Sequence, residues 1–182
     1  MTQSARQART KELRGRRIML QPLTDADADA LVAILAEPEV ARWWPTFDRR
    51  RVLRELIAER EAEEGFAIEL DDRIVGYIQA AEEVDPEFRH ASIDLFLATA
   101  AQGQGLGPDA IRTLAADLID RRGHHRITID PVANNTRATA AYVKVGFRPV
   151  GRLRQYQRMG DGTWADALLM ELLADELIRN GA

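Results

Sequence analysis

Apolar and polar residues alternate along this chain with two different periods, and the period changes from one segment to the next. Alternation every second residue and short apolar runs are typical of strands, whereas apolar residues three and four positions apart are typical of helices. The segment 48–64 has four apolar residues on one helical face: Val52, Leu53, Leu56 and Ile57. This succession of patterns, without internal repeats, predicts an α/β protein built on a mixed sheet.

The boundaries of the expected elements come from turn and cap residues. Strands are expected at 18–23, 66–70, 74–80, 90–98, 126–130, 147–157 and 164–172, and helices at 24–36, 48–64, 108–122 and 135–145. Thr24 and Asn135 suit N-caps, and Pro38 should interrupt the first helix. Gly65 suits the end of the second helix and Pro108 the first position of the third. The short links 71–73 and 160–162 predict two antiparallel hairpins.

The run Gln102-Gly103-Gln104-Gly105-Leu106-Gly107 lies between an expected strand and an expected helix. Glycines let a backbone approach an anion closely, and the unpaired N–H groups of the first helical turn point at it. A pyrophosphate could bind there, although a plain tight turn has the same glycine spacing. A Walker loop does not fit, because no Lys-Ser/Thr pair follows. A dinucleotide fingerprint does not fit either, because Asp117 and Asp120 fall within the helix.

Composition narrows the class of protein. The chain has 182 residues, 46% of them hydrophobic, which suits one globular domain. It contains no cysteine, which excludes disulfides and thiolate nucleophiles, and its three histidines, His90, His124 and His125, lack metal-ligand spacing. No apolar run approaches the ~18 residues of a membrane span and the start lacks the apolar region of a secretory signal, so we expect a cytoplasmic protein without a metal or a membrane partner.

Charge is distributed unevenly along the chain. Residues 1–17 carry six basic side chains against Glu12, and the remaining residues have a net charge of −9. We expect residues 1–15 to form a disordered basic tail and residues 16–182 a single domain. The acidic body favours cationic substrates and disfavours nucleic acid; a nucleic-acid-binding or targeting function would depend on the tail alone.

Two motifs together resemble the GCN5-related N-acetyltransferase (GNAT) superfamily. The spacing of Gln102, Gly105 and Gly107 is similar to its acetyl-CoA signature, and Asn135, Ala138, Tyr142 and Gly146-Phe147 follow in the superfamily's order. The resemblance implies the GNAT fold: a mixed, mostly antiparallel sheet flanked by helices and splayed at the acetyl-CoA site. It also implies acetyl-CoA as the donor and these cofactor-binding residues: Leu95, Phe96, Leu97, Gln102, Gly103, Gln104, Gly105, Leu106, Gly107, Asn135, Ala138, Tyr142 and Lys144.

Direct acetyl transfer sets three chemical requirements: a neutral amine, a donor for the developing oxyanion and a proton for the leaving thiolate. Backbone N–H groups of residues 95–97 would serve the oxyanion, as in the superfamily. Tyr142 is either a core aromatic or, as the resemblance implies, the proton donor. Asp94 is the one acid in an apolar strand, so it forms a structural salt bridge or serves as base or anchor for the amine. An ordinary carboxylate is a poor base for an ammonium, so direct proton transfer requires burial or a water relay.

A narrower similarity points to the aminoglycoside 6′-N-acetyltransferases and covers roughly residues 18–170. It rests on Asp94, Trp43-Trp44, residues 76–79, Asp85-Pro86, Asp130-Pro131 and the second motif. It implies these substrate residues: Trp43, Trp44, Gln79, Glu83, Asp85, Asp94, Asp130 and Asp161, with Asp94 and Tyr142 catalytic. The loop 82–89 departs from the family's tryptophan-rich acidic segment, which leaves the drug specificity open.

Simpler roles remain for several of these residues, and so do other functions for the chain. The tryptophans could pack the helical arm on the sheet, Asp130 could shape a turn, and Glu83 and Asp85 could belong to a solvated loop. Similar sequences acetylate hydroxylysine in siderophore assembly or the N-terminal amines of ribosomal proteins. A CoA-binding module without catalysis is the alternative of another class, and Asp94 and Tyr142 argue against it. The sequence allows a monomer or a homodimer.

Overall fold

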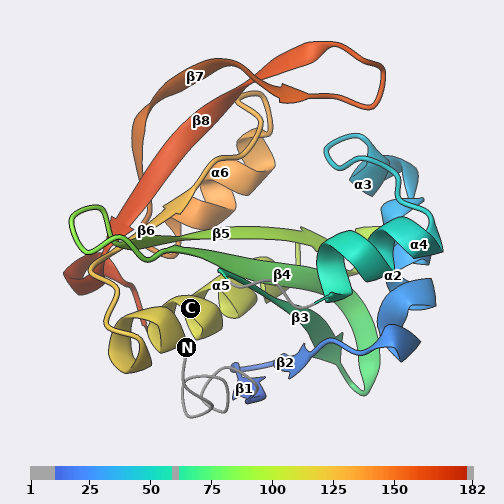
Figure 1. The fold of residues 1–182 in the computed structure, drawn as a ribbon, viewed down its shortest axis with the longest axis horizontal. Helices are drawn as coiled ribbons and strands as arrows, with labels where there is room; N and C mark the ends of the chain where they lie inside the picture. Colours follow the sequence, from blue (N-terminus) through green and yellow to red (C-terminus); the bar gives the residue numbers. More distant parts are fainter. Residues whose placement is uncertain (1–10, 59–61, 180–182) are drawn as a thin grey trace.

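The computed structural model describes residues 11–58 and 62–179, which form one eight-stranded sheet with helices on both faces (Figure 1). The spatial order of its strands is β1-β2-β3-β4-β5-β6-β8-β7. Every neighbouring pair is antiparallel except β5 and β6, which are parallel. The strands are β1 Leu13–Arg14, β2 Met19–Pro22, β3 Glu63–Leu70, β4 Arg73–Glu83, β5 His90–Leu97, β6 Arg126–Ile129, β7 Arg148–Arg158 and β8 Trp164–Leu173.

The helices of the described chain cover two separate apolar cores. They are α2 Ala28–Leu35, α3 Pro38–Ala41, α4 Arg49–Val52, α5 Leu106–Ala116 and α6 Thr136–Val143, with π-helical turns at Leu53–Ile57 and Asp117–Arg121 and short 3-10 turns at Asp25–Asp27, Thr99–Ala101 and Ala174–Glu176. Because side chains alternate across a strand, Ile78 packs in the core under α5 while its neighbour Tyr77 packs in the core under α2. The sheet therefore presents two distinct faces.

Most predicted elements lie where the sequence patterns place them. Thr24 forms a capping box with Asp27 ahead of α2, and Asn135 caps α6. The hairpin of β3 and β4 turns at Asp71 and Asp72, whose φ angles of 51° and 60° are those of a tight hairpin turn that aspartate tolerates. Pro38, expected only to interrupt a helix, begins the short helix α3.

The predicted helix at 48–64 is too long. The π-turn after α4 ends at Ile57, and Gly65 lies inside β3 instead of ending a helix. A Cβ at Gly65 would lie 2.8 Å from the ring of Tyr77, so this glycine is required by close packing across the hairpin and is not a helix stop. A glycine required for packing looks the same in the sequence as one that ends a helix.

Helix α5 begins two residues earlier than predicted. Gly105, with φ of 81°, is its N-cap, and Pro108 is the third helical residue instead of the first. The position is still favourable, because N–H groups in the first turn have no partner within the helix.

The expected tail differs from the structure where residues 11–15 are described. Leu13 and Arg14 form β1, paired with Leu20 and Met19 of β2. The following turn is held against α5, because the carboxylate of Asp109 accepts the backbone N–H groups of Arg16 at 3.0 Å and Arg17 at 2.8 Å. Residues 1–10 lie outside the described part of the chain. The division into a tail and one domain remains a prediction.

The helices of these described ranges are short or polar. None of them combines the length and the apolar character that a bilayer crossing requires.

Candidate active site

A gap in the sheet opens where β5 and β6 diverge. The two strands pair only through Ala91 with Ile127 and Ser92 with Thr128, so the rest of β5 faces this gap along one edge. Ala98 donates its N–H to the carbonyl of Val75 in β4 at 2.8 Å, so the N–H groups two residues apart that alternate with it, including that of Leu95, point into the gap, where Leu95 donates to the carboxylate of Asp94 at 3.0 Å. Backbone groups alternate between the two edges of a strand, so the N–H of Leu97 points the same way. The strand therefore offers the backbone donors that an acyl oxygen requires.

A cavity of about 580 Å³ adjoins this open edge. It lies between the α3 segment, β5, the glycine loop and α6. Eleven of the predicted cofactor-binding residues line it: Leu95, Phe96, Leu97, Gln102, Gly103, Gly105, Gly107, Asn135, Ala138, Tyr142 and Lys144. The other two do not, because Leu106 is fully buried in the core and Gln104 donates its side-chain N–H to the carbonyl of Ala100 at 2.6 Å.

The glycine loop has the shape of an anion cradle. Gly103 and Gly105 adopt φ angles of 76° and 81°, which favour glycine, and they leave the backbone uncovered at the start of the 11-residue helix α5. Arg137 lines the same cavity, with its guanidinium 3.4 Å from where a Cβ of Gly103 would lie. Arg137 was not predicted from the sequence. Arg137 lies in the first turn of α6, at the positive end of the helix dipole, where a cation is unfavourable unless an anion binds nearby. This position is the feature of the sequence that could have indicated an anionic ligand.

The opposite wall of the cavity is aromatic. Trp43 and Trp44, predicted to contact the substrate, both line it, and the Trp44 ring meets Phe96 edge-on at 5.1 Å. Phe96 in turn stacks on Tyr77, whose hydroxyl donates to the side-chain oxygen of Gln79 at 2.6 Å. Gln79 lies directly across from Asp94 in the β4–β5 pairing. Trp44 therefore packs on the sheet and also lines the cavity, whereas Trp43 lines the cavity; contact of either tryptophan with a substrate remains a prediction.

Two carboxylates and two tyrosines gather beside the gap; we call Asp94, Asp130, Tyr142 and Tyr156 the cleft cluster. They come from β5, the end of β6, α6 and β7. The hydroxyl of Tyr156 donates to Oδ2 of Asp130 at 2.9 Å. Asp94 interacts electrostatically with Asp130, and Tyr142 with both carboxylates. Among the ion pairs of residues 11–58 and 62–179, none includes Asp94 or Asp130, so the structural salt bridge considered for Asp94 is not found there.

The surroundings of the cleft cluster shift its proton affinities. The Asp94 side chain is accessible to solvent, yet protein atoms surround it within the cleft. That desolvation, together with the charge of Asp130, raises the pKa of Asp94 to about 7. Desolvation also raises the pKa of Asp130, and the Tyr156 hydrogen bond opposes this. Burial and then the two carboxylates raise the pKa of Tyr142, which therefore keeps its proton at neutral pH.

This arrangement has the groups needed for acid–base chemistry. A carboxyl with a pKa near 7 is ionised in part at neutral pH and holds a transferred proton far better than an ordinary aspartate. Tyr142, still protonated, can donate to a leaving group. The raised pKa that direct proton transfer to Asp94 would require is present.

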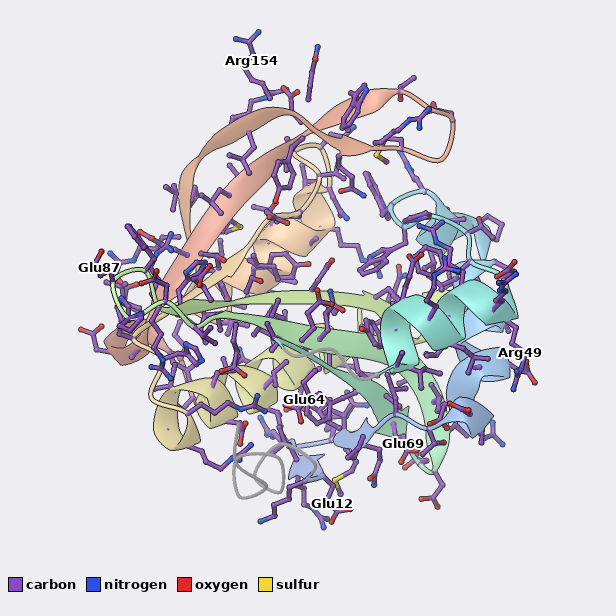
Figure 2. All side chains as sticks on the ribbon, viewed as in Figure 1. Glu12, Arg49, Glu64, Glu69, Glu87 and Arg154 are labelled. Atoms are coloured by element: carbon purple, nitrogen blue, oxygen red, sulfur yellow. The ribbon has the colours of Figure 1, made fainter. Side chains whose placement is uncertain are left out.

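Six of the eight predicted substrate residues are not among those that line the cavity. Gln79, Asp94 and Asp130 lie beside the gap, whereas Glu83 and Asp85 lie at the far end of the β4–β5 pairing and Asp161 in the β7–β8 turn. Glu83 pairs with His90, four residues along β5 from Asp94 and hence roughly 13 Å away. Its carboxylate accepts the N–H of Asp85 at 3.0 Å, and Asp85 accepts the N–H of Glu87 at 2.9 Å. Figure 2 shows Glu87 of this loop at the edge of the molecule far from α2 and α4. Asp161 accepts the N–H of Thr163 at 2.9 Å in the β7–β8 turn. Their roles toward a substrate remain predictions.

Two further residues of the site carried no signal in the sequence. Tyr156 and Gln157 lie in a strand whose pattern is polar and exposed, and only the course of β7 brings them to the cleft.

Across the described segments, no group of three or more His, Asp or Glu side chains is arranged to bind a metal ion.

Proteins of known family and structure share this fold. The model of the acetyltransferase (GNAT) domain matches residues 17–148. No curated protein matches the chain. RimJ of Mycobacterium smegmatis in complex with CoA-disulfide is 24% identical, with a TM-score of 0.79 over 96% of this chain and 92% of that chain. A ribosomal-protein-S5-alanine acetyltransferase of Vibrio fischeri is 16% identical, with a TM-score of 0.76 over 92% of this chain and 98% of that chain. A spermidine N-acetyltransferase chimera from Vibrio cholerae and hSSAT is 18% identical, with a TM-score of 0.74 over 90% of this chain and 99% of that chain. The predicted fold is confirmed, whereas the comparisons single out no acceptor.

Proposed function

The chain belongs to the acetyltransferase (GNAT) domain family, and on that premise we propose that it transfers an acetyl group from acetyl-CoA directly to a primary amine of a cationic substrate. One observation carries the proposal: Asp94 and Asp130 lie together beside the open edge of β5, within electrostatic reach of Tyr142, which lines the cavity next to the glycine loop. A thioester laid along that edge would have its carbonyl near the β5 amides and a base and an acid nearby.

The donor half of the site suits coenzyme A. Its pyrophosphate would bind the backbone N–H groups of residues 103–107, with Arg137 and Lys144 as nearby positive charges. Asn135 would contact the pantetheine or phosphate portion, although its side chain already accepts the N–H of Ala138 at 3.1 Å as a helix cap. The similar RimJ structure is a complex with CoA-disulfide, which supports this assignment.

The acceptor half then supplies the proton transfers. Asp94 accepts a proton from the substrate ammonium, directly or through water, and the neutral nitrogen attacks the thioester carbon. The N–H of Leu97, and that of Leu95 once it leaves the Asp94 carboxylate, stabilise the oxyanion. The carbon–sulfur bond breaks as Tyr142 donates its proton to the thiolate, and the phenolate can recover a proton from the N-acetylated product. The enzyme forms no covalent intermediate.

We infer that the acceptor is the 6′-amine of an aminoglycoside. Such a sugar carries several ammonium groups and an apolar ring face, which suit the carboxylate pair and the tryptophan wall formed by Trp43 and Trp44. A protein N-terminal amine is the second candidate, favoured by the similarity to the Vibrio fischeri ribosomal-protein-S5-alanine acetyltransferase. Hydroxylysine is a third acceptor of the same chemistry.

The experiment is a measurement of thiol release from acetyl-CoA by the purified full-length chain with a panel of acceptors. The panel pairs an aminoglycoside carrying a 6′-amine with the counterpart carrying a 6′-hydroxyl, and adds hydroxylysine, spermidine and an Ala-initiated peptide. We expect turnover of the 6′-amine and none of its 6′-hydroxyl counterpart. If the 6′-amine and 6′-hydroxyl aminoglycosides react at equal rates, the assignment of the 6′-amine as the acceptor is refuted. If the peptide alone is acetylated, the acceptor is a protein N-terminal amine.

A further inference from the structure

Strand β7 departs from regular pairing as it passes the acceptor side of the cleft. Its register with β8 shifts between Leu153 and Gln157, and Gln155 has a φ of 48°, which is unusual for a residue other than glycine. The carboxylate of Asp166 on β8 holds the irregularity, accepting the N–H of Gln155 at 2.7 Å and the guanidinium of Arg152 at 2.6 Å. We call residues 155–157 the β7 bulge.

The β7 bulge brings two consecutive side chains to opposite walls of the cleft. Tyr156 donates to Asp130 at 2.9 Å, on the wall formed by the end of β6. Gln157 donates its side-chain N–H to the backbone carbonyl of Trp43 at 3.0 Å, on the aromatic wall. Figure 1 shows the β7–β8 hairpin extending past α6 toward α3, in agreement with this bridge. A bulge bends its strand and changes the direction in which the neighbouring side chains point, so the irregular pairing contributes to both contacts.

The hydrogen bond to Asp130 leaves that carboxylate with capacity for a ligand. A carboxylate accepts about four hydrogen bonds, and Tyr156 uses one site on Oδ2. Tyr156 remains 51% exposed although its hydroxyl is held, so its ring lines the approach to Asp130 and is not part of the core. Within the described chain, the titratable groups that interact with Asp130 are Asp94, Tyr142 and Tyr156, and none of these three is a cation.

We propose that the β7 bulge determines acceptor specificity, with Tyr156 as a positioning residue that orients Asp130 to bind a second ammonium group of the acceptor while Asp94 faces the reacting amine. The inference rests on the proposed function, since it assigns different roles to the two carboxylates of the same site. A fixed, charged Asp130 prefers an acceptor with two or more cationic groups over a monoamine. The bridge from Gln157 to Trp43 keeps the two walls at a set separation around such an acceptor.

The test compares Tyr156→Phe with the unaltered enzyme and with Arg154→Ala, a control on the same strand whose side chain projects into solvent (Figure 2). We expect Tyr156→Phe to raise KM for the polyamine acceptor about tenfold, as expected for one lost hydrogen bond to a charged group. At pH 8, where Asp94 is ionised in both proteins, we expect kcat and KM for acetyl-CoA to stay within about twofold, and a monoamine acceptor to show no change. An unchanged KM for the polyamine, or an equal loss for both acceptors, would overturn the proposal.

A second measurement does not depend on turnover. Carboxyl carbon NMR of the protein, titrated with pH, reports Asp130 and Asp94 directly. Because the Tyr156 hydrogen bond lowers the pKa of Asp130, Tyr156→Phe is expected to raise it and, by leaving Asp130 less charged, to lower that of Asp94. If no amine is acetylated by the unaltered enzyme, the proposed function fails; if amines are acetylated but both titrations are unchanged in Tyr156→Phe, only the positioning role fails.

Discussion

Two groups of acidic side chains in this protein have opposite surroundings. One, which we call the ion-pair cluster, joins Arg122, just after the π-helical turn that follows α5, to Glu64, Glu82 and Asp117. The other is the cleft cluster, where Asp94 and Asp130 lie together and Tyr156 provides a hydrogen bond in place of a cation. The ion-pair cluster gives each of its carboxylates a cationic partner. The cleft cluster does not, and this difference separates a structural role from a binding role.

The ion-pair cluster fastens the end of a helix to the sheet. The Arg122 side chain is only 9% exposed, and it reaches Glu82 and Asp117 at 2.9 Å each as well as Glu64. Burial works against its charge, but the three carboxylates outweigh burial and keep the pKa of the guanidinium raised. His124 adds a contact between its Nε2 and Glu82 at 2.7 Å, and burial lowers its pKa.

The cleft cluster has the properties of a site that binds a cation. Burial and mutual repulsion raise the pKa of Asp94 to about 7, which shows that its charged form is disfavoured by the protein around it. A substrate ammonium would relieve that repulsion when it binds. Charged side chains that destabilise the folded state in this way are retained mostly where function requires them.

Removing the cation of the ion-pair cluster should give the largest effect. Arg122→Met leaves Glu64, Glu82 and Asp117 close together with their common partner gone, so we expect the free energy of unfolding to fall by about 3 kcal/mol or more. Urea denaturation at pH 7 measures it.

The matched control is Arg49→Met, at an arginine that projects from the surface near α2 and pairs with Asp29 while both side chains are more than half exposed (Figure 2). That change should cost at most ~1 kcal/mol, because solvent screens such pairs. If the two variants lose similar free energies of unfolding, the buried ion pairs of Arg122 stabilise the protein no more than the exposed pair of Arg49 does.

Removing a charge from the cleft cluster should act on chemistry instead. Asp94→Asn keeps the shape of the side chain and an oxygen able to accept the Leu95 N–H, but it cannot take a proton. We expect kcat with the best amine to fall at least ~10²-fold, while the Kd for acetyl-CoA, measured by calorimetry, stays the same. Turnover that is unchanged in Asp94→Asn would remove this residue from its catalytic role, and weaker acetyl-CoA binding would point to a distorted β5 edge.

The sequence predicted what local patterns determine. Alternating strands, the glycine loop before α5 and the Asn135 cap depend on neighbouring residues, and the structure places them as expected. The failures have tertiary causes. Gly65 accommodates the ring of Tyr77, which belongs to another strand, so reading it as a helix end extended the helix too far.

The candidate site also contains residues that local sequence patterns indicated and residues that only tertiary contacts bring there. Asp94 stood out because one acid interrupts an apolar strand, and Tyr142 because it belongs to a motif. Glu83, Asp85 and Asp161 were included by resemblance, yet each makes a local turn contact in the structure. Tyr156 could not be identified beforehand, because its contact with Asp130 spans 26 residues and depends on an irregular strand.

The smallest predicted effect concerns stability, and its sign distinguishes the two clusters. Asp94 has a pKa of about 7 in the folded protein and an ordinary value of 3.8, so between these values the folded state binds more protons than the unfolded state. Stability therefore falls as pH rises from about 4 to about 7, and the loss is complete above the folded pKa. Asp94→Asn removes this penalty. Because the carboxylate is accessible to solvent, which screens the effect, we expect its melting temperature to exceed that of the unaltered protein by only about 2–4 °C at pH 8 and by less at pH 4.5.

The control for this measurement is Asp161→Asn in the β7–β8 turn. Hydrogen bonds from Thr163 lower the pKa of Asp161, so its charge favours the folded state above pH 4, and its loss should leave the melting temperature at pH 8 unchanged or slightly lower. Thermal unfolding of the three proteins at both pH values gives the comparison. If Asp94→Asn lowers the melting temperature at pH 8, the carboxylate of Asp94 is stabilised in the folded protein by a partner, as in the ion-pair cluster, and the cleft lacks the unfavourable charge that a substrate ammonium would neutralise.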